Sequence, residues 1–598
     1  GIIYIGKVLY AYRGAMLPNT SIEIKAGTMT IKDNAFQWCS NLASITIPNS
    51  VTQIGNNVFE GCRSLKSIGL PNGIVTIGNR AFALCDSVAK VEIPSSVTSI
   101  GSAVFDDCYN LVEIAVANDN QYYTSDDGIL FNKEKTRLIK YPAKKVSTTY
   151  VLPNTVRIIE YGAFGSCSNL NSIELPNSVT SIEDYAFSYC YNLTKIVIPA
   201  DMMFIGDNAF IQCVKLREVY NMSSLDIKLG EFTNGMVAHY AKNVYTEEGG
   251  SKIDQIGDYQ FYVEEDNVEL ISYIGDATDL ILPDDYRGAC YTIGHNAFYF
   301  HDNITSLTIP YCVTSIGNNA FWGCSSLTSI TLPDGLTSIG NGAFRLCTSL
   351  NSVVVPNSVT HIGNDAFSHC MNLKHITLSN SMERINYGLF YDCGSLVSIV
   401  IPSSVVKIDR LSFYGCVSLK DVRVEDAFSK LEIGYNDMFG EKQWLFADCP
   451  LESVYIGRDL SFDTSKDAGY SPFYNQTGLK TVMIGENVTK MENYLLYNCS
   501  AIEKIYSFAT TPPKASRLTF RGVNTDICSV TVPIGSLADY TSAAYWKTFF
   551  NMAEADLSGV GSIQTNNLKP VYYNLNGQRV LNPSEGIYIQ NGRKVYIR

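Results

Sequence analysis

The sequence lacks the features that would assign it to several common functional classes. No run of eighteen apolar residues occurs along its 598 residues, so we expect no transmembrane segment. The net charge is −13, whereas nucleic-acid binding depends on Lys and Arg that neutralise phosphates, so we expect no nucleic-acid partner. The composition therefore indicates an acidic folded protein.

Motifs of catalysis and metal binding are also missing. The sequence contains no G-x-G-x-x-G, G-x-x-x-x-G-K-[S/T] or H-E-x-x-H pattern. Its 17 cysteines show no C-x-x-C spacing of the kind that structural zinc sites use. We therefore expect no catalytic residue, no cofactor and no metal ion, and we interpret the protein as a non-enzyme.

What the sequence does contain is a repeat of 23 residues, and cysteine marks it most clearly. The cysteines at this step are Cys39, Cys62, Cys85 and Cys108, then Cys167, Cys190 and Cys213, then Cys324, Cys347, Cys370, Cys393 and Cys416. His301 and Gln476 take the same slot one step before Cys324 and Cys499. A fixed period of this size is typical of a solenoid, in which each repeat stacks on its neighbours.

Each repeat follows the pattern I-G-x-x-A-F-x-x-C-x-x-L-x-x-I-x-I-P-x-x-V-T-x. The L-x-x-I-x-I-P segment is too short for a helix and ends at proline, which favours a strand. The V-T-x-I-G segment alternates and ends at glycine, which indicates a second strand. The N-x-A-F-x-x-C segment predicts a single capped helical turn. Stacking such repeats predicts a mainly β solenoid with parallel strand ladders and short helical turns.

Three of the six histidines lie near Cys370 in the phrase HIGNDAFSHCMNLKH. Taken linearly, this phrase resembles a metal or Cys-His site. On the repeat, however, His361 starts the I-G strand, His369 lies in the predicted helical turn and His375 lies on the L-x-x-I strand. Because these are three sides of one coil, we expect the three histidines not to meet.

The repeat resembles the leucine-rich repeat family, and more closely its BspA-like branch of bacterial surface proteins, over nearly the whole chain. The segment SLADYTSAAYWKTF, 536–549, is similar to the family's end piece. The tail KPVYYNLNGQRVLNPSEGIYIQNGRKVYIR has two Asn-Gly turns, which indicate hairpins, and resembles the sorting segments of type IX secretion. The resemblance implies a leucine-rich-repeat solenoid that a Gram-negative bacterium secretes or displays on its surface. It also implies adhesion to host extracellular-matrix proteins or to other cell-surface proteins.

The places where the period fails predict the domain boundaries. We expect a first repeat block at 1–219 with a hairpin insert near 118–145, an irregular β-rich connecting segment at 220–290, a second repeat block with a C-terminal cap at 291–556, and a linker with a sorting-like hairpin at 557–598.

The cysteine column admits two interpretations. Residues in one slot of a solenoid lie above one another at about the 4.8 Å spacing of strands, so the thiols can form a packed, reduced column. One or two disulfides between neighbours are the alternative, since a bridge needs its own Cβ geometry. Cys290, Cys312 and Cys528 fall outside the slot, and any bridge is expected to involve these.

The exposed strand positions carry mostly Ser and Thr, which pair well across strands but offer no converging charges. Tyrosine is frequent, with 38 residues, and several tyrosines crowd the interruptions of the repeat. Tyr is a good contact residue for protein partners, so we predict ligand contacts at Tyr240, Tyr245, Tyr259, Tyr470, Phe473 and Tyr474. The function we expect is a cell-surface or secreted binding protein. The alternative is a glycan-binding or glycan-processing accessory protein.

Overall fold

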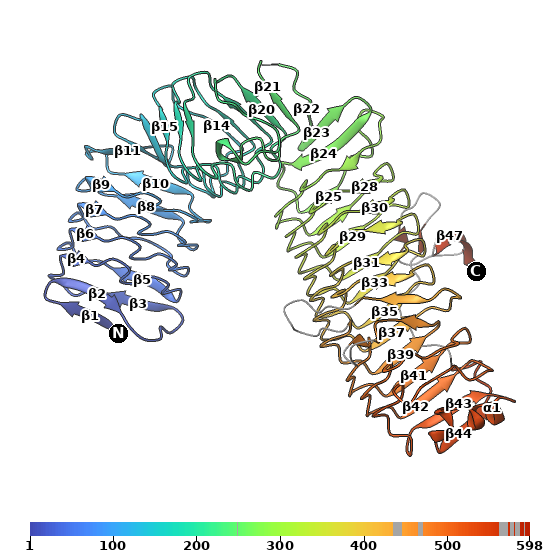
Figure 1. Ribbon diagram of the computed structural model, residues 1–598. Coiled ribbons are helices and arrows are strands. Elements are labelled where there is room, and N and C mark those ends of the chain that lie inside the picture. Colours follow the sequence, from blue (N-terminus) through green and yellow to red (C-terminus); the bar gives the residue numbers. More distant parts are fainter. Residues whose placement is uncertain are drawn as a thin grey trace. The chain divides into compact units, whose positions relative to one another are not determined.

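The computed structural model describes residues 1–247, 249–434, 445–464 and 470–560, together with the strand segments 572–573, 579–580, 586–590 and 593–597. The chain forms two compact units, Gly1–Asp254 (unit 1) and Gln255–Arg598 (unit 2). Each unit is a stack of coils linked by parallel strand ladders (Figure 1). The predicted leucine-rich-repeat type of β solenoid is thereby confirmed.

Each coil contributes to two ladders. Its L-x-x-I-x-I segment forms a strand of a long-strand ladder, and its V-T-x-I segment forms a two-residue strand of a short-strand ladder. In β31 (Ser352–Val354), for example, Val353 is buried and the residues on either side are exposed. The apolar side chains of successive coils therefore point into one continuous interior, while the neighbouring residues face outward.

The strands of unit 1 form separate ladders of both kinds. The short-strand ladders are β1 (Ile2–Ile5), β2 (Val8–Tyr12), β4 (Thr30–Ile31), β6 (Gln53–Ile54), β7 (Thr76–Ile77) and β9 (Ser99–Ile100), then β11 (Tyr123–Asp126), β12 (Ile129–Asn132), β13 (Arg137–Lys140), β15 (Ile158–Ile159), β17 (Ser181–Ile182) and β19 (Phe204–Ile205). The long-strand ladders are β3 (Thr20–Glu23) with β5 (Leu42–Thr46), β8 (Lys90–Ile93) with β10 (Glu113–Val116), β14 (Thr149–Val151) with β16 (Ser172–Glu174), and β18 (Lys195–Ile198) with β20 (Glu218–Asn221) and β21 (Asn243–Tyr245). A 3-10 turn, η1 (Asn234–Met236), follows β20.

Unit 2 repeats the arrangement over more coils. Its short-strand ladders contain β23 (Tyr259–Glu264), β24 (Asn267–Tyr273), β26 (Thr292–Ile293), β28 (Ser315–Ile316), β30 (Ser338–Ile339) and β32 (His361–Ile362), then β34 (Arg384–Ile385), β36 (Lys407–Ile408), β38 (Leu431–Ile433) and β40 (Leu460–Ser461). Its long-strand ladders contain β25 (Asp279–Ile281), β27 (Ser306–Thr308), β29 (Ser329–Thr331), β31 and β33 (His375–Thr377), then β35 (Ser398–Ile401), β37 (Asp421–Val424), β39 (Ser453–Ile456), β41 (Thr481–Ile484), β42 (Lys504–Ser507), β43 (Ser529–Pro533) and β44 (Asn551–Ala555). The strand β22 (Ile253–Ile256) crosses the boundary between the units.

The prediction of a helical turn in the N-x-A-F-x-x-C segment is wrong. The segment forms consecutive tight turns with two left-handed residues, as at Asn319 (φ 53°) and Gly323 (φ 74°). A left-handed residue cannot continue a right-handed helix. Alternate residues instead donate to the next coil, since the N–H of Phe321 bonds the carbonyl of Ala343 at 2.8 Å. We call this side of each coil the turn face.

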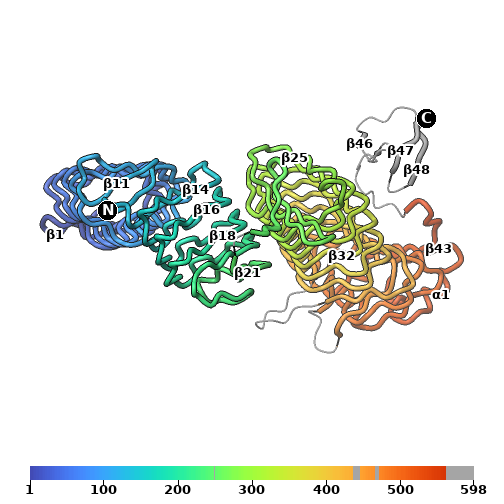
Figure 2. The backbone as a smooth tube through the Cα atoms, turned by 90° about the horizontal axis from the view of Figure 1, so that it is seen from above, coloured from blue at the N-terminus to red at the C-terminus, as the bar shows by residue number. Residues whose placement is uncertain are grey.

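The described residues of the two units form three hydrophobic cores, and each core begins at an antiparallel hairpin. The hairpins are β1–β2, β11–β12 and β23–β24, and the last strand of each leads into a short-strand ladder. In β12, Leu130 belongs to the first core of unit 1, whereas Ile129 and Phe131 belong to its second core. Figure 2 looks along the first coils of unit 1, whose loops superimpose around a common interior. The hairpin therefore separates two stacks within unit 1.

The C-terminal end of unit 2 is closed by aromatic side chains. α1 (Leu537–Ser542) follows Ser536, and the 3-10 turn η4 (Trp546–Thr548) follows α1. Trp546 is fully buried, donates its indole N–H to the carbonyl of Pro513 at 2.8 Å and packs edge-on against Phe520. These groups cover apolar side chains that a further repeat would otherwise cover.

The tail forms antiparallel strands. β45 (Tyr572–Tyr573) pairs with β46 (Arg579–Val580) and with β47 (Gly586–Gln590), and β47 pairs with β48 (Arg593–Ile597). The two predicted Asn-Gly turns, at 576–577 and 591–592, lie outside the described residues.

Candidate binding surfaces

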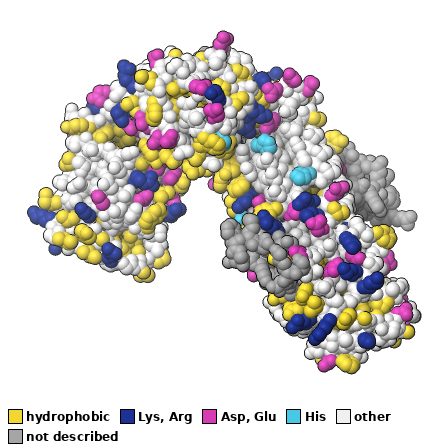
Figure 3. Space-filling view, viewed as in Figure 1, with side chains coloured by type: hydrophobic (Ala, Val, Ile, Leu, Met, Phe, Trp, Pro, Cys, Tyr) yellow, Lys and Arg dark blue, Asp and Glu magenta, His cyan; other side chains and the backbone are white. Residues whose placement is uncertain are grey.

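The long-strand face is chemically uniform over three successive coils of unit 2. In β27, β29 and β31 the outward positions are held by Ser306, Thr308, Ser329, Thr331, Ser352 and Val354. In the view of Figure 3, the upper coils of unit 2 show few charged side chains, and Lys, Arg, Asp and Glu gather over its lower coils. A surface of small hydroxyl side chains can match the shape of a partner, but it offers no charged side chain for the partner to bind.

The three clustered histidines lie apart, as the repeat predicts. His361 lies on the short strand β32, His375 on the long strand β33, and His369 in the turn between Phe367 and Cys370. His369 instead lies 3.4 Å from the carboxylate of Asp392 in the next coil. Within the described residues, no group of three His, Cys, Asp or Glu side chains could hold a metal ion.

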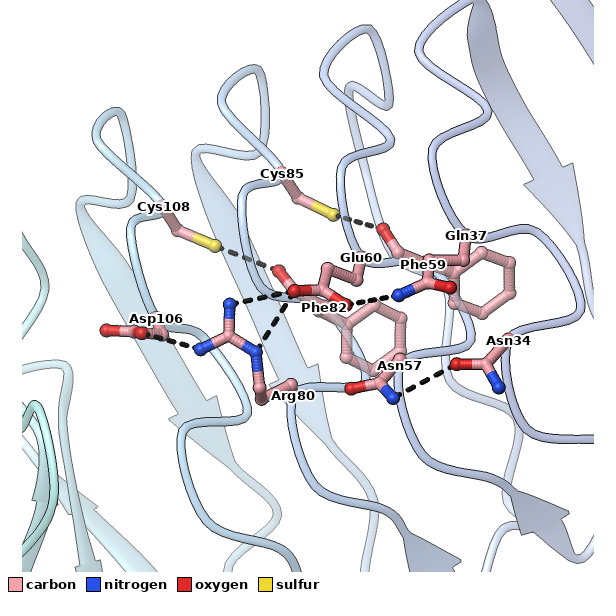
Figure 4. A network of polar contacts seen from close by, with 10 residues as sticks. All are labelled: Asn34, Gln37, Asn57, Phe59, Glu60, Arg80, Phe82, Cys85, Asp106 and Cys108. Carbon is pink, nitrogen blue, oxygen red and sulfur yellow. Dashed lines mark hydrogen bonds and ion pairs between the residues drawn. The ribbon is translucent and has the colours of Figure 1, made fainter.

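The slot cysteines form a column of buried, free thiols in which only Cys39 is partly exposed. Most of these thiols donate to the carbonyl of the Phe in the preceding coil, as Cys85 does to Phe59 at 3.3 Å and Cys108 to Phe82 at 3.1 Å (Figure 4). Cys167 donates instead to the carbonyl of Tyr141, at 3.9 Å. The Phe carbonyl also accepts the backbone N–H of the cysteine in its own coil. The thiol is thus a small apolar side chain that supplies a weak donor to a buried carbonyl.

Two members of this column show what the slot requires. Cys449 is a member that sequence spacing missed, because an insertion separates it from Cys416 by 33 residues (449 − 416), and its thiol bonds the carbonyl of Phe413 at 3.2 Å. Gln476 donates its side-chain N–H to the carbonyl of Phe446 at 2.9 Å, where another coil uses a thiol. This position of the repeat therefore requires a buried hydrogen-bond donor, and it does not require a reactive sulfur.

Two of the cysteines outside the slot form a disulfide bond. Cys290 and Cys312 form a disulfide between adjacent coils of unit 2, whereas Cys528 is free and buried. The expectation that a bridge would use the off-slot cysteines is therefore confirmed for one pair. The bridge lies near the surface, because Cys290 is exposed.

The predicted tyrosine contacts divide into exposed and buried residues. Tyr240, Tyr245, Tyr259 and Tyr474 are partly exposed. Tyr470 is 5% exposed and Phe473 is 1% exposed. Phe473 stacks on Phe446 in the core, with ring centroids 5.6 Å apart. The prediction of ligand contacts at Tyr470 and Phe473 is therefore wrong, because both side chains are part of the interior.

The remaining four tyrosines divide between the two units. Tyr245 stacks on Tyr220 at the end of the last long-strand ladder of unit 1, and Tyr240 packs edge-on against His239. In unit 2, Tyr259 lies in the hairpin β23–β24, whereas Tyr474 lies on the turn face and stacks on Tyr497.

Tyr474 belongs to a row that the sequence analysis missed. In unit 2, the residue after each ladder Phe or Leu is often aromatic or Arg and partly exposed, and the members are Tyr299, Trp322, Arg345, Tyr391, Tyr414, Tyr474 and Tyr497. We call these residues the aromatic row. The Arg345 guanidinium lies 4.6 Å from the Trp322 ring centre, and the rings of Tyr391 and Tyr414 stack at 5.3 Å. Aligning the residue after each Phe would have revealed this row.

The same position in unit 1 has different chemistry. It carries Gln37, Glu60, Ala83, Asp106, Gly165, Ser188 and Ile211. The guanidinium of Arg80 lies between Glu60 and Asp106, at 2.8 Å and 3.0 Å, and Gln37 donates to Glu60 at 2.7 Å (Figure 4). These four groups satisfy one another, so they form a closed polar network on the first coils of unit 1.

The geometry defines a leucine-rich repeat scaffold, in which short strands of stacked coils present long flat faces. The BspA type leucine-rich repeat region matches residues 9–135, 143–267, 291–420 and 436–542, and the chain belongs to this family. No curated protein sequence matches the chain. In the described part of the chain, no helix has the length and apolar character to cross a membrane.

Solved structures of similar proteins come from several bacteria. A leucine-rich repeat protein from Eubacterium ventriosum is 23% identical over 58% of this chain and 82% of its own, with a TM-score of 0.32. A leucine-rich cell surface protein from Faecalibacterium prausnitzii is 22% identical over 79% of this chain and 95% of its own, with a TM-score of 0.26. A leucine-rich repeat protein from Bacteroides ovatus is 26% identical over 68% of this chain and 78% of its own, with a TM-score of 0.27.

Proposed function

We propose that this protein is a non-enzymatic adhesion scaffold that binds a protein partner through the aromatic row of unit 2. The observation that carries the proposal is the chemistry of that row. Tyr, Trp and Arg are the residues most often found at energetic centres of protein interfaces, and here they lie side by side and partly exposed. Ser and Thr on the long-strand face are rarely such centres.

The stacked arrangement of the row supports the same proposal. Tyr494 and Arg521 both pack against Tyr497, and Tyr497 stacks on Tyr474 at 5.7 Å. These contacts hold the rings in place before a partner arrives. Binding then costs less side-chain entropy than it would with free side chains.

A location outside the reducing cytosol suits the disulfide. Disulfides persist in oxidising compartments, and Cys290–Cys312 lies near the surface where reductants could reach it. Burial protects the column thiols from oxidation in the same environment. We propose a secreted or surface-displayed protein of a Gram-negative bacterium, with the tail strands β45–β48 as its type IX sorting segment.

The partners we propose are host extracellular-matrix proteins, such as fibronectin or fibrinogen, or proteins on other cells. A single copy should bind weakly, because the aromatic row offers few anchors, and display of many copies should raise the avidity. Tyr240, Tyr245 and Tyr259 remain a second proposed contact set.

Replacing Tyr474 and Tyr497 with Ser is expected to lower capture of fibronectin or fibrinogen by bead-displayed protein at least tenfold. The expectation follows from the size of hot-spot effects, which are about 2 kcal/mol or more for each residue. Bound ligand would be measured by fluorescence at a series of concentrations.

The matched control is Tyr161→Ser with Tyr185→Ser, a partly exposed tyrosine pair on unit 1 with ring centres 5.5 Å apart. Its capture should equal that of the unchanged protein. A third variant replaces Ser329, Thr331 and Ser352 with Asp. If that variant abolished capture while the Tyr474 and Tyr497 variant kept it, the long-strand face would be the binding site and the proposal would fail.

A further inference from the structure

The repeat pattern changes in two successive coils of unit 2. The three coils before them carry S-I-G-N, S-I-G-N and H-I-G-N at the end of the short strand, whereas these two carry R-I-N-Y (384–387) and K-I-D-R (407–410). Gly363 donates its backbone N–H to the coil before it, but Asn386, which stands in the glycine position, donates its side-chain amide to the carbonyl of Ile362. At this point one short-strand ladder ends at β32 and another begins at β34.

The change replaces a hydroxyl surface with a charged one. The short strands of successive coils pair in register, and one paired position holds Ser315, Ser338 and His361 in turn. In the next ladder, the equivalent position holds Arg384, Lys407, Glu432 and Ser461. Arg384 holds Asp409 through two parallel hydrogen bonds of 2.6 Å, and Lys407 pairs with Glu432. Two ion pairs therefore lie next to each other, on β34, β36 and β38 and at Asp409, the residue directly after β36.

A groove of about 750 Å3 lies over these pairs. Beside the paired charges, its lining contains Asn364, Tyr387, Arg410, Ser461, Phe462 and a third carboxylate, that of Asp463. This volume falls within the usual range for small-molecule sites, which is about 300–1,000 Å3. The groove is thus large enough for several sugar residues.

Arg410 is the cation of this groove that has no carboxylate partner among the described residues. Its guanidinium lies 5.4 Å from the centre of the Tyr387 ring, and the side chain is partly exposed. In contrast, the other two lining cations are Arg384, paired with Asp409, and Lys407, paired with Glu432. A guanidinium offers five N–H donors in a planar fork that matches carboxylate and sulfate oxygens.

The paired groups keep unused hydrogen-bonding capacity. A carboxylate has about four lone-pair sites, and the two bonds from Arg384 use only part of the capacity of Asp409. Sugar hydroxyls both donate and accept, so neighbouring hydroxyls can bond such a mixed array where an apolar ligand cannot. The rings of Tyr387 and Phe462 supply apolar surface beside it.

We propose that this groove binds an acidic oligosaccharide, with Arg410 contacting its carboxylate or sulfate group and the Arg384–Asp409 and Lys407–Glu432 pairs contacting its hydroxyls. The groove is separate from the aromatic row, so this binding goes beyond the protein adhesion proposed above. Either activity can be lost without the other.

The test uses the full chain and calorimetric titration with three tetrasaccharides. The first is sulfated chondroitin, the second is its desulfated form, which keeps the carboxylates, and the third is a neutral N-acetyllactosamine tetrasaccharide. We expect one or both acidic sugars to bind and the neutral sugar to bind at least tenfold more weakly. Binding of both acidic sugars assigns the carboxylate as the recognised group, and binding of the sulfated sugar alone assigns the sulfate.

Arg410→Ala is expected to weaken binding of the acidic sugar about tenfold to a hundredfold, as loss of a charge-assisted hydrogen bond does. Arg410→Lys keeps the charge but loses the planar guanidinium, so its affinity for the acidic sugar should lie between those of the unchanged protein and of Arg410→Ala. This variant also provides the test if the alanine variant does not fold. The matched control is Arg287→Ala, since the Arg287 guanidinium also lies over an aromatic ring, that of Tyr286, but the residue lies outside both the groove and the aromatic row. Its affinity should not change.

Several results would overturn the proposal. Equal binding of the neutral sugar would remove the role of the anion. A hexaglutamate peptide that bound as tightly as the sugars would show a general anion site. Equal losses in Arg410→Ala and Arg287→Ala, or no loss in any Arg410 variant, would show that the groove is not the site.

Discussion

Replacing Phe344 with alanine is expected to lower the free energy of unfolding of the coils around it by about 3–5 kcal/mol. Phe344 is fully buried and stacks between Phe321 and Phe367, with ring centres 5.2 Å and 5.3 Å away. Alanine would leave a cavity that these two rings line. Because stability in a solenoid is shared between neighbouring repeats, the loss should reach beyond one coil.

Denaturant unfolding followed by tryptophan fluorescence measures this effect, and Trp322 in the adjacent coil supplies a local signal. The matched control is Phe428→Ala, since Phe428 is 96% exposed and undergoes the same chemical change. The control should leave the unfolding midpoint unchanged. Equal midpoints for Phe344→Ala and the control would show that the phenylalanine column does not hold the coils together.

The repeat could be predicted from the sequence because each of its positions has one physical task. The 23-residue step of Cys, Phe and Ile predicts stacked coils, and proline and glycine mark the strand ends. The turn conformation was harder to predict. Asn319 and Gly323 tolerate left-handed backbone, but Leu346 adopts it too, at φ 60°, because the stacked coils impose it. Local preference thus gives way to the hydrogen bonds between coils.

The binding surfaces were harder still, because they lie where the repeat varies. Tyr474 was predicted from a tyrosine-rich segment, but its neighbour Phe473 is buried, since the Phe column passes through that same segment. The groove is lined by Asp409 and Arg410, which stand where earlier coils have glycine and asparagine. In the sequence alone, such replacements cannot be told from random variation, because the residues come together only when the coils are stacked.

The second large effect concerns the thiols, and we expect Cys39 to react far faster than the other column cysteines in the folded protein. Cys39 is partly exposed, and the rest are buried. Burial raises the pKa of the Cys370 thiol from 9.0 to about 12 and also raises that of Cys347. Only the thiolate reacts, so burial slows the reaction of Cys370 both by shielding the sulfur and by raising its pKa.

Iodoacetamide labelling at pH 8, followed by peptide mass spectrometry at set times, measures each cysteine separately. Cys39 should label first, the buried column thiols should label only after denaturant is added, and Cys290 and Cys312 should label only after reduction. Cys39→Ser is the control, and it should remove the fast reaction without exposing another thiol. If Cys347 or Cys370 labelled as fast as Cys39 in the native protein, the thiols would be accessible, and their role as buried donors to the Phe carbonyls would be refuted. A redox or binding role for the column would then have to be considered, because an accessible row of thiols would be costly to keep reduced outside the cytosol.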